Sequence, residues 1–133
     1  MPTDLFWLTL TILMTALFWA PYVVDRLIVR GLVPTLADGQ PVDTEIHSKW
    51  AQRAMAAHRN AVENLVIFAP LVLTANALHL STPVIQIAAA AYFFARLAHF
   101  IIYTAGIPVL RTLSFTVGCI AQITIALAIL HWV

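Results

Sequence analysis

The sequence predicts an all-α integral membrane protein, a bundle of four helices that each cross the bilayer. Hydrophobic residues make up 62% of the 133 positions and charged residues only 10%, whereas a soluble domain carries about 25% charged residues. The apolar residues fall into four stretches of a length near the roughly 20 residues that a membrane-spanning helix needs. We therefore expect a single four-span domain over residues 1–133. The net charge of +1 leaves no basic surface for nucleic acid, so we expect no nucleic-acid partner.

The first predicted span is Leu5–Val24, which contains no charged residue and lies between Asp4 and Asp25. No Lys or Arg precedes it, and it is longer than the apolar segment of a signal peptide, so we expect it to be retained. Pro and Gly among polar residues in Leu32–Asp43 indicate a loop.

The second predicted span belongs to a helix that restarts after this loop. Asp43 or Thr44 can cap its N-terminus, and the choice between them stays open. The first turns carry charged residues outside the bilayer, and we expect the helix to enter lipid around Glu63 and to continue to about Leu80.

The third and fourth predicted spans are separated by short turns. Thr82 can cap a helix and Pro83 suits its first turn, so span three runs from Pro83 to about Tyr103. Gly106 and Pro108 are expected to end it. Span four then runs from near Arg111 to Val133.

Loop charge predicts the orientation. Five of the seven Lys and Arg residues lie between spans one and two, and a sixth, Arg111, lies on the same side of the membrane. The turn around Ser81 has none. The positive-inside rule therefore places the first loop in the cytoplasm and both termini outside. Short loops and the lack of a retention tail favour a bacterial inner membrane.

Helical geometry predicts that polar residues from three spans meet in one layer. At about 1.5 Å per residue, Glu63 lies about 27 Å from the turn between spans two and three, and Arg96 and His99 lie about 20 and 24 Å from it. Arg96, His99 and Tyr103 fall within an arc of about 60° on their helix. Arg111 opens span four on the same side. We expect one polar layer near the cytoplasmic boundary.

The chemistry of this layer suits a small zwitterion that is rich in carboxylates. Guanidinium groups bind carboxylates in a bidentate manner, and Glu63 offers a negative group for an ammonium. The five histidines lack metal-ligand spacing, so we expect no metal site. Cys119 has no evident base near it, and a reactive thiol would have to come from the ligand, where an adjacent arginine would favour the thiolate.

Two motifs carry a family resemblance. The pattern Arg53…Ala57-His58-Arg59-Asn60-x-x-Glu63…Phe68, followed by Arg96-x-x-His99-x-x-x-Tyr103, resembles the MAPEG family. These are the membrane-associated proteins of eicosanoid and glutathione metabolism, which include microsomal prostaglandin E synthase and microsomal glutathione transferase. The resemblance covers about Lys49 to Gln122, and the four-span layout agrees with it.

The resemblance implies a homotrimer that binds glutathione between subunits near the cytoplasmic side. It assigns Arg111 to stabilisation of the glutathione thiolate and places Thr112 where a relative has a serine with a role in thiol activation. The glutathione-binding residues that it implies are Arg53, Arg59, Asn60, Glu63, Arg96, His99 and Tyr103, with Arg26 or Arg30 from the first helix. Phe115 and Ala56 replace a tyrosine and an arginine, which implies weaker glutathione binding or a different thiol or substrate.

Three functional classes follow. The first is a glutathione-dependent transferase or peroxidase that acts on a lipophilic substrate, and the second is a non-catalytic protein with the same fold. The third is a small transporter in which Glu63 and His99 relay protons. It is disfavoured because transport sites usually lie near the bilayer midplane. We expect His58 to make a subunit contact or a structural hydrogen bond, and Gln122 to bond between helices.

Overall fold

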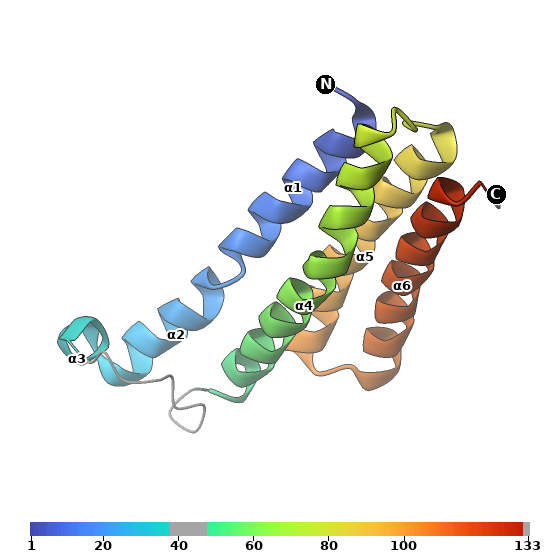
Figure 1. The fold of residues 1–133 in the computed structure, drawn as a ribbon. Helices are drawn as coiled ribbons and strands as arrows, with labels where there is room; N and C mark the ends of the chain where they lie inside the picture. The colour runs from blue at the N-terminus through green and yellow to red at the C-terminus, as the bar shows by residue number, and fades with distance from the viewer. Residues whose placement is uncertain (38–47, 132–133) are drawn as a thin grey trace.

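The computed structural model describes residues 1–37 and 48–131, and it confirms the all-α prediction over these residues. The helices are α1 (Thr3–Leu17), α2 (Ala20–Arg30), α3 (Leu32–Ala37), α4 (Lys49–Ala77), α5 (Pro83–Ala105) and α6 (Pro108–Ile129). Helices α1, α4, α5 and α6 form the bundle, and α2 continues from α1 and ends at the short α3 (Figure 1). The N-terminus, the α4–α5 turn and the end of α6 lie at the same end of the bundle (Figure 1).

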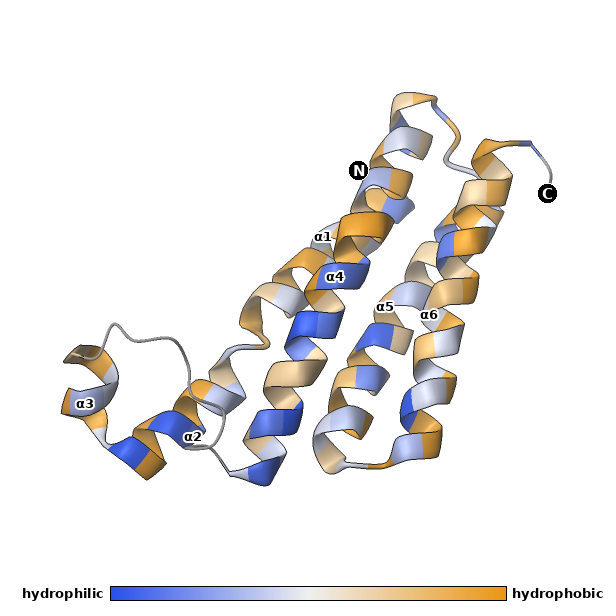
Figure 2. Cartoon of the chain, turned by 60° about the horizontal axis from the view of Figure 1, so that its bottom comes forward, coloured by the Kyte–Doolittle hydropathy of each residue, from blue (hydrophilic) through white to orange (hydrophobic). Residues whose placement is uncertain are grey.

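Within the described residues, four helical segments are long and apolar enough to cross a membrane. They are α1 with α2, taken together as Thr3–Arg30, and then α4, α5 and α6. Many large apolar side chains are exposed on the outside of the bundle, as expected for helices that face lipid or other membrane helices. Hydrophilic positions gather on α2 and on the half of α4 that lies beside it (Figure 2).

The first span is longer than predicted, and it is broken. Helix α1 ends at Leu17, and α2 begins two residues after Phe18 and continues to Arg30, well beyond the expected end at Val24. The break has a local cause in Pro21. Proline lacks an N–H, and its ring clashes with the carbonyl of the residue four positions earlier, which here is Leu17.

The predicted loop over Leu32–Asp43 is wrong for its first part, which forms α3. Gly31, with a φ of 86°, turns the chain between α2 and α3. Pro34 is tolerated because it lies in the first turn, where its missing N–H has no intrahelical partner. Thr35 Oγ1 donates to the Gly31 carbonyl at 2.7 Å. The rest of this segment, with the predicted caps Asp43 and Thr44, lies outside the described residues.

Helix α4 is anchored at its start by a carboxylate from α2. Ser48 immediately precedes the helix, and its backbone N–H and its Oγ donate to Asp25 Oδ2 and Oδ1 at 3.0 and 2.6 Å. At the other end His79 has a left-handed φ of 57°, so the helix ends at Ala77 rather than at about Leu80 as predicted.

Helices α5 and α6 form a hairpin whose ends are set by caps. Thr82 Oγ1 accepts a hydrogen bond from the Ile85 N–H at 3.4 Å, which confirms the predicted cap of α5. Gly106 ends α5 with a left-handed φ of 80°. Helix α6 begins at Pro108, three residues before the predicted start at Arg111, because proline suits the first turn of a helix instead of preventing it.

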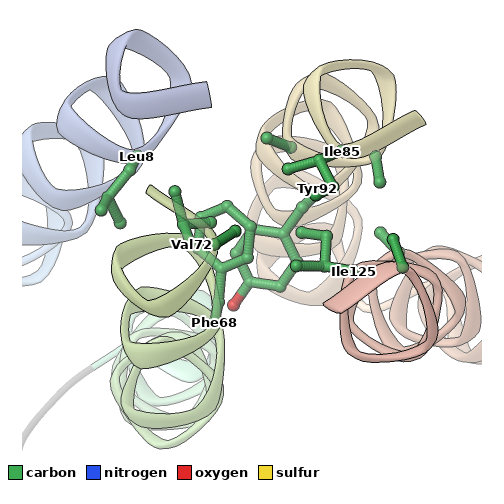
Figure 3. Close-up of a cluster of buried hydrophobic side chains, with 11 residues drawn as sticks. Leu8, Phe68, Val72, Ile85, Tyr92 and Ile125 are labelled. Atoms are coloured by element: carbon green, nitrogen blue, oxygen red, sulfur yellow. The ribbon is translucent and has the colours of Figure 1, made fainter. Parts of the chain in front are cut away.

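The bundle core lies between α1, α4, α5 and α6. Figure 3 shows its largest side chains, which are Leu8, Phe68, Val72, Ile85, Tyr92 and Ile125. The rings of Phe68 and Tyr92 stack with centroids 3.8 Å apart and an interplanar angle of 11°. Buried alanines on α4, α5 and α6 fill the remaining contacts, as small residues do where membrane helices pack closely.

Candidate ligand-binding site

A cleft of about 270 Å³ lies between α4, α5 and α6, and we call it the three-helix cleft. The residues that line it are Asn60 of α4, His99 and Tyr103 of α5, and Arg111, Thr112 and Phe115 of α6. Five of these six are residues that the sequence places in a ligand site. Three helices therefore deliver polar side chains to one place, as the heights along the helices predict, while the roles of these residues in binding stay predictions.

The wall of the cleft combines one guanidinium with aromatic rings. Arg111 Cζ lies 4.7 Å from the centroid of the Tyr103 ring, which is a cation–π distance. The His99 ring meets the Tyr103 ring edge-on, with centroids 5.5 Å apart at 74°, and lies 6.0 Å from the Phe115 ring. These contacts hold the Arg111 charge at the cleft without neutralising it.

Thr112 is exposed at the edge of this cleft. Its Oγ1 donates to the Pro108 carbonyl at 3.2 Å, four residues earlier in the same helix. Thr116 Oγ1 donates in the same way to the Thr112 carbonyl at 2.9 Å, so threonine hydroxyls in this part of α6 bond to the backbone of their own helix. While its hydrogen is used in this way, the Thr112 oxygen can only accept a hydrogen bond from a ligand.

Arg96 lies beneath the cleft and not on its wall. Its side chain is 2% exposed, and Nη2 donates to Asn60 Oδ1 at 2.5 Å and lies 3.5 Å from His99 Nδ1. Gly118 of α6 lies beside the arginine stem, where a Cβ would make an ordinary van der Waals contact of 3.5 Å with Arg96 Cδ. The sequence predicts Arg96 as a ligand contact, but its hydrogen bonds are with two residues of the wall, Asn60 and His99.

Arg53 lies at the α5–α6 turn, outside the wall of the cleft. Its Nε donates to the Thr104 carbonyl at 2.9 Å. Its side chain also covers Gly106, where a Cβ would lie 3.1 Å from Arg53 Nε. This arginine therefore satisfies a carbonyl in the last turn of α5, where no helical N–H is available.

Arg59 and Glu63 line a different cleft, of about 380 Å³, between α2 and α4. The α2–α4 cleft is completed by Tyr22, Met55, His58 and Val62. Both charged side chains are exposed, and within residues 1–37 and 48–131 no ion pair joins them. The Tyr22 hydroxyl lies 2.8 Å from His58 Nδ1, which is the second of the two roles expected for His58, a structural hydrogen bond.

The two arginines of α2 lie in neither cleft lining. Arg26 is half-buried, and its Nε and Nη2 atoms are buried without a hydrogen-bond partner among the described residues. Arg30 is half-buried near the end of α2 and has a contact of its own. The choice between them as a ligand contact stays open.

Two buried amides connect the cleft to the bundle below it. Gln122 Nε2 donates to the Asn64 carbonyl at 3.0 Å, which confirms the interhelical bond predicted for Gln122. Asn64 Nδ2 in turn donates to the Asn60 carbonyl at 2.9 Å. Sequence reasoning missed Asn64, although its position one helical turn after Asn60 is a visible signal.

In the part of the chain that the structure describes, no group of three or more His, Cys, Asp or Glu side chains could hold a metal.

Comparison with known proteins gives one finding. The model of the MAPEG family matches residues 5–131, which is nearly the whole chain. No curated protein and no solved structure matches in the two other comparisons. The matched range includes the four apolar helical segments, except the first two residues of Thr3–Arg30, and every residue that lines the three-helix cleft. The chain therefore belongs to the MAPEG family, and it is an integral membrane protein that crosses the bilayer several times.

Proposed function

We propose that the three-helix cleft binds glutathione and that the protein is a glutathione-dependent transferase or peroxidase acting on a lipophilic substrate. The observation that carries this proposal is the set of donors from three helices in one cleft. Among the described residues, the Arg111 guanidinium and the Tyr103 hydroxyl have no protein acceptor, so both are available to a ligand. The MAPEG family generally uses glutathione, and it includes both transferases and non-catalytic members.

The residues of the cleft fit part of glutathione. Tyr103 and Asn60 can donate to its carboxylates and amide carbonyls, and Arg111 can donate to its sulfur. Its ammonium needs an acceptor, and the expected one, Glu63, lines the α2–α4 cleft instead. The cleft volume of about 270 Å³ is also just below the range of about 300–1,000 Å³ that is usual for ligand pockets. A homotrimer with the cleft at the interface between protomers would supply the rest of the site.

The side chains of the cleft suit thiol chemistry. When bound, glutathione would supply the thiol that is conjugated to an electrophile or oxidised by a peroxide. A positive charge next to a thiol favours the thiolate, and Arg111 carries that charge at the cleft wall. The Tyr103 ring orients the guanidinium through the cation–π contact. Next to Arg111, Thr112 offers an oxygen that can accept a hydrogen bond from the ligand.

The proposal includes one four-span domain over residues 1–133, with the end that holds α2, α3 and the α5–α6 turn in the cytoplasm. The concentration of Lys and Arg at that end supports this orientation. A bacterial inner membrane is the location that we propose. The lipophilic substrate would then reach the site from the bilayer and glutathione from the cytoplasm.

A non-catalytic member of the family is the second candidate. Two observations favour it, because Phe115 brings no hydroxyl to the cleft, and Arg53 and Arg96 are engaged by other parts of the protein. A proton-relay transporter has no such support. Its two proposed relay groups, Glu63 and His99, line different clefts.

Thermal unfolding of the purified protein in lipid nanodiscs tests the proposal. Glutathione at 100 times its Kd should stabilise the native state by about 2.7 kcal/mol, and S-methylglutathione should do much the same because it lacks only the free thiol. Conjugation to a chlorinated aromatic electrophile reports activity. Stabilisation without conjugation or peroxidase activity would establish the non-catalytic alternative, and the absence of both stabilisation and turnover would overturn the proposal.

A variant of Arg111 tests the chemical step separately from binding. Arg111→Ala should reduce conjugation about 100-fold, the scale of losing one charge-stabilising donor, with a much smaller effect on glutathione binding. Lys49→Ala is the matched control, because Lys49 is an exposed cation at the start of α4 and lines neither cleft. Equal loss of binding and turnover in Arg111→Ala would show that this arginine only holds the ligand.

A further inference from the structure

We infer that Arg96 is a positioning residue that turns the amide of Asn60 and the ring of His99 so that the three-helix cleft offers N–H donors to its ligand. The inference rests on the proposed function and adds a specificity to it. A cleft with this arrangement selects a carboxylate or a similar anion at the place between Asn60 and His99. It would exclude an ammonium from that place.

The first step concerns the amide of Asn60. Arginine has five N–H donors and no acceptor, so the Asn60 atom 2.5 Å from Arg96 Nη2 must be the oxygen. Asn64 Nδ2 lies 3.4 Å from the same oxygen and also donates to it. The amide orientation is therefore required by the chemistry of its neighbours. The NH₂ group of Asn60 is left for the cleft that this residue lines.

The second step concerns the ring of His99. Nδ1 lies 3.5 Å from Arg96 Nη2, and beside a group that can only donate it can only accept. In the neutral ring one nitrogen carries the hydrogen and the other accepts, so Arg96 favours the tautomer with the hydrogen on Nε2. His99 lines the same cleft as Asn60, so both side chains can present N–H groups to one ligand.

The third step concerns the charge of Arg96 itself. The side chain is 2% exposed, and its Cζ lies 5.9 Å from the centroid of the Phe115 ring. Its Nε is buried and has no hydrogen-bond partner among the residues that the structure describes. Within the described ranges no carboxylate pairs with it. A buried and unpaired charge is costly. An anion in the cleft would offset this cost.

Asn60→Asp is the sharpest test, because it replaces the proposed donor with a carboxylate oxygen and leaves an oxygen facing Arg96. The variant should keep or gain thermal stability through an ion pair with Arg96, and it should bind glutathione at least about tenfold more weakly because two like charges then face each other. A glutathione ester with blocked carboxylates should show a much smaller loss. Tighter binding of glutathione by Asn60→Asp would overturn the inference, because the amide oxygen would then be facing the ligand ammonium.

The tautomer of His99 gives a readout that needs no ligand. Protein with ¹⁵N-labelled histidine should show the His99 signals of a ring with the hydrogen on Nε2, assigned by their absence in His99→Gln. Arg96→Met removes the donors at similar length and should shift these signals toward the other tautomer, and Arg96→Lys should retain part of the wild-type pattern. Unchanged signals in folded Arg96→Met would refute the positioning role. This result stands even if the wild-type protein does not bind glutathione, which would refute only the proposed function.

Discussion

Replacing Arg53 with methionine should loosen the α5–α6 turn and leave the three-helix cleft intact. The variant loses the bond of 2.9 Å between Arg53 Nε and the Thr104 carbonyl. A hydrogen bond from a charged donor contributes about 1.5–3 kcal/mol, and a cation at a helix C-terminus contributes about 0.3–1 kcal/mol more at an exposed position. Arg53 is only half-buried, so we take the lower part of this range. The expected loss in the free energy of unfolding is about 2 kcal/mol.

The assay is equilibrium unfolding in detergent micelles, with glutathione binding measured on the same samples. Lys49→Met is the control, since it removes an exposed cation from the same helix and should change stability by less than about 0.5 kcal/mol. Gly106→Ala should also destabilise, because alanine is strained at a φ of 80° and its Cβ would lie 3.1 Å from Arg53 Nε. Part of that penalty should disappear in the Arg53→Met background, because the flexible methionine side chain can move away from the added Cβ.

The refuting result is specific. If Arg53→Met unfolds at the same denaturant concentration as the wild type but no longer binds glutathione, then Arg53 is a ligand residue, as the family resemblance implies. The structural explanation from the Thr104 carbonyl would then be wrong. A loss of stability with glutathione affinity within about twofold would confirm it, because binding energy and folding energy would have been separated.

Two further predictions concern the packing around the clefts. Phe68→Ala should destabilise the bundle by about 2–4 kcal/mol, mainly through the cavity that it leaves and the lost stack on Tyr92, since lipid competes with the core for apolar groups. The exposed Val66→Ala should have little effect in the same unfolding assay, and equal losses would contradict the packing argument. Tyr22→Phe should cost about 0.5–1.5 kcal/mol through the bond to His58. The double variant with His58→Phe should cost clearly less than the sum of the two single variants, and full additivity would mean that the pair does not interact.

Most of the fold follows from sequence because the bilayer limits the choices. Charge-free apolar stretches, together with Thr82 and Pro83, place four spans and one cap correctly. Three errors in the helix bounds arise at prolines, and the early end of α4 at Ala77 arises at His79. Pro21 breaks the first span, Pro34 is accommodated in α3, and Pro108 begins α6, and these differences depend on where each proline falls relative to a helix start. A sequence shows the proline, but it does not show which turn of which helix it will occupy.

The site is only half predictable for a related reason. Heights and directions of Cα atoms follow from helical rise and rotation, and they correctly bring Asn60, His99, Tyr103 and Arg111 together. The direction of a long side chain does not follow from them. Arg96 and Arg53 start near the predicted layer, but their guanidinium groups reach neighbours inside the protein, Asn60 Oδ1 and the Thr104 carbonyl.

Asn60 lines one cleft and Arg59 and Glu63 line another, and this separation limits how a single chain can bind a zwitterion. Successive residues of α4 differ by about 100°, so a polar arc of about 120° can face two neighbouring helices instead of one. Asn60 faces α5 and α6, while Arg59 and Glu63 face the α2 side. Of the two cleft linings, only the α2–α4 cleft contains a carboxylate, that of Glu63, beside the cation of Arg59, whereas the charged group of the three-helix cleft is the Arg111 guanidinium. A ligand that carries both carboxylates and an ammonium needs both kinds of group, so the proposed trimer would have to bring an acceptor from elsewhere to the donor-lined cleft.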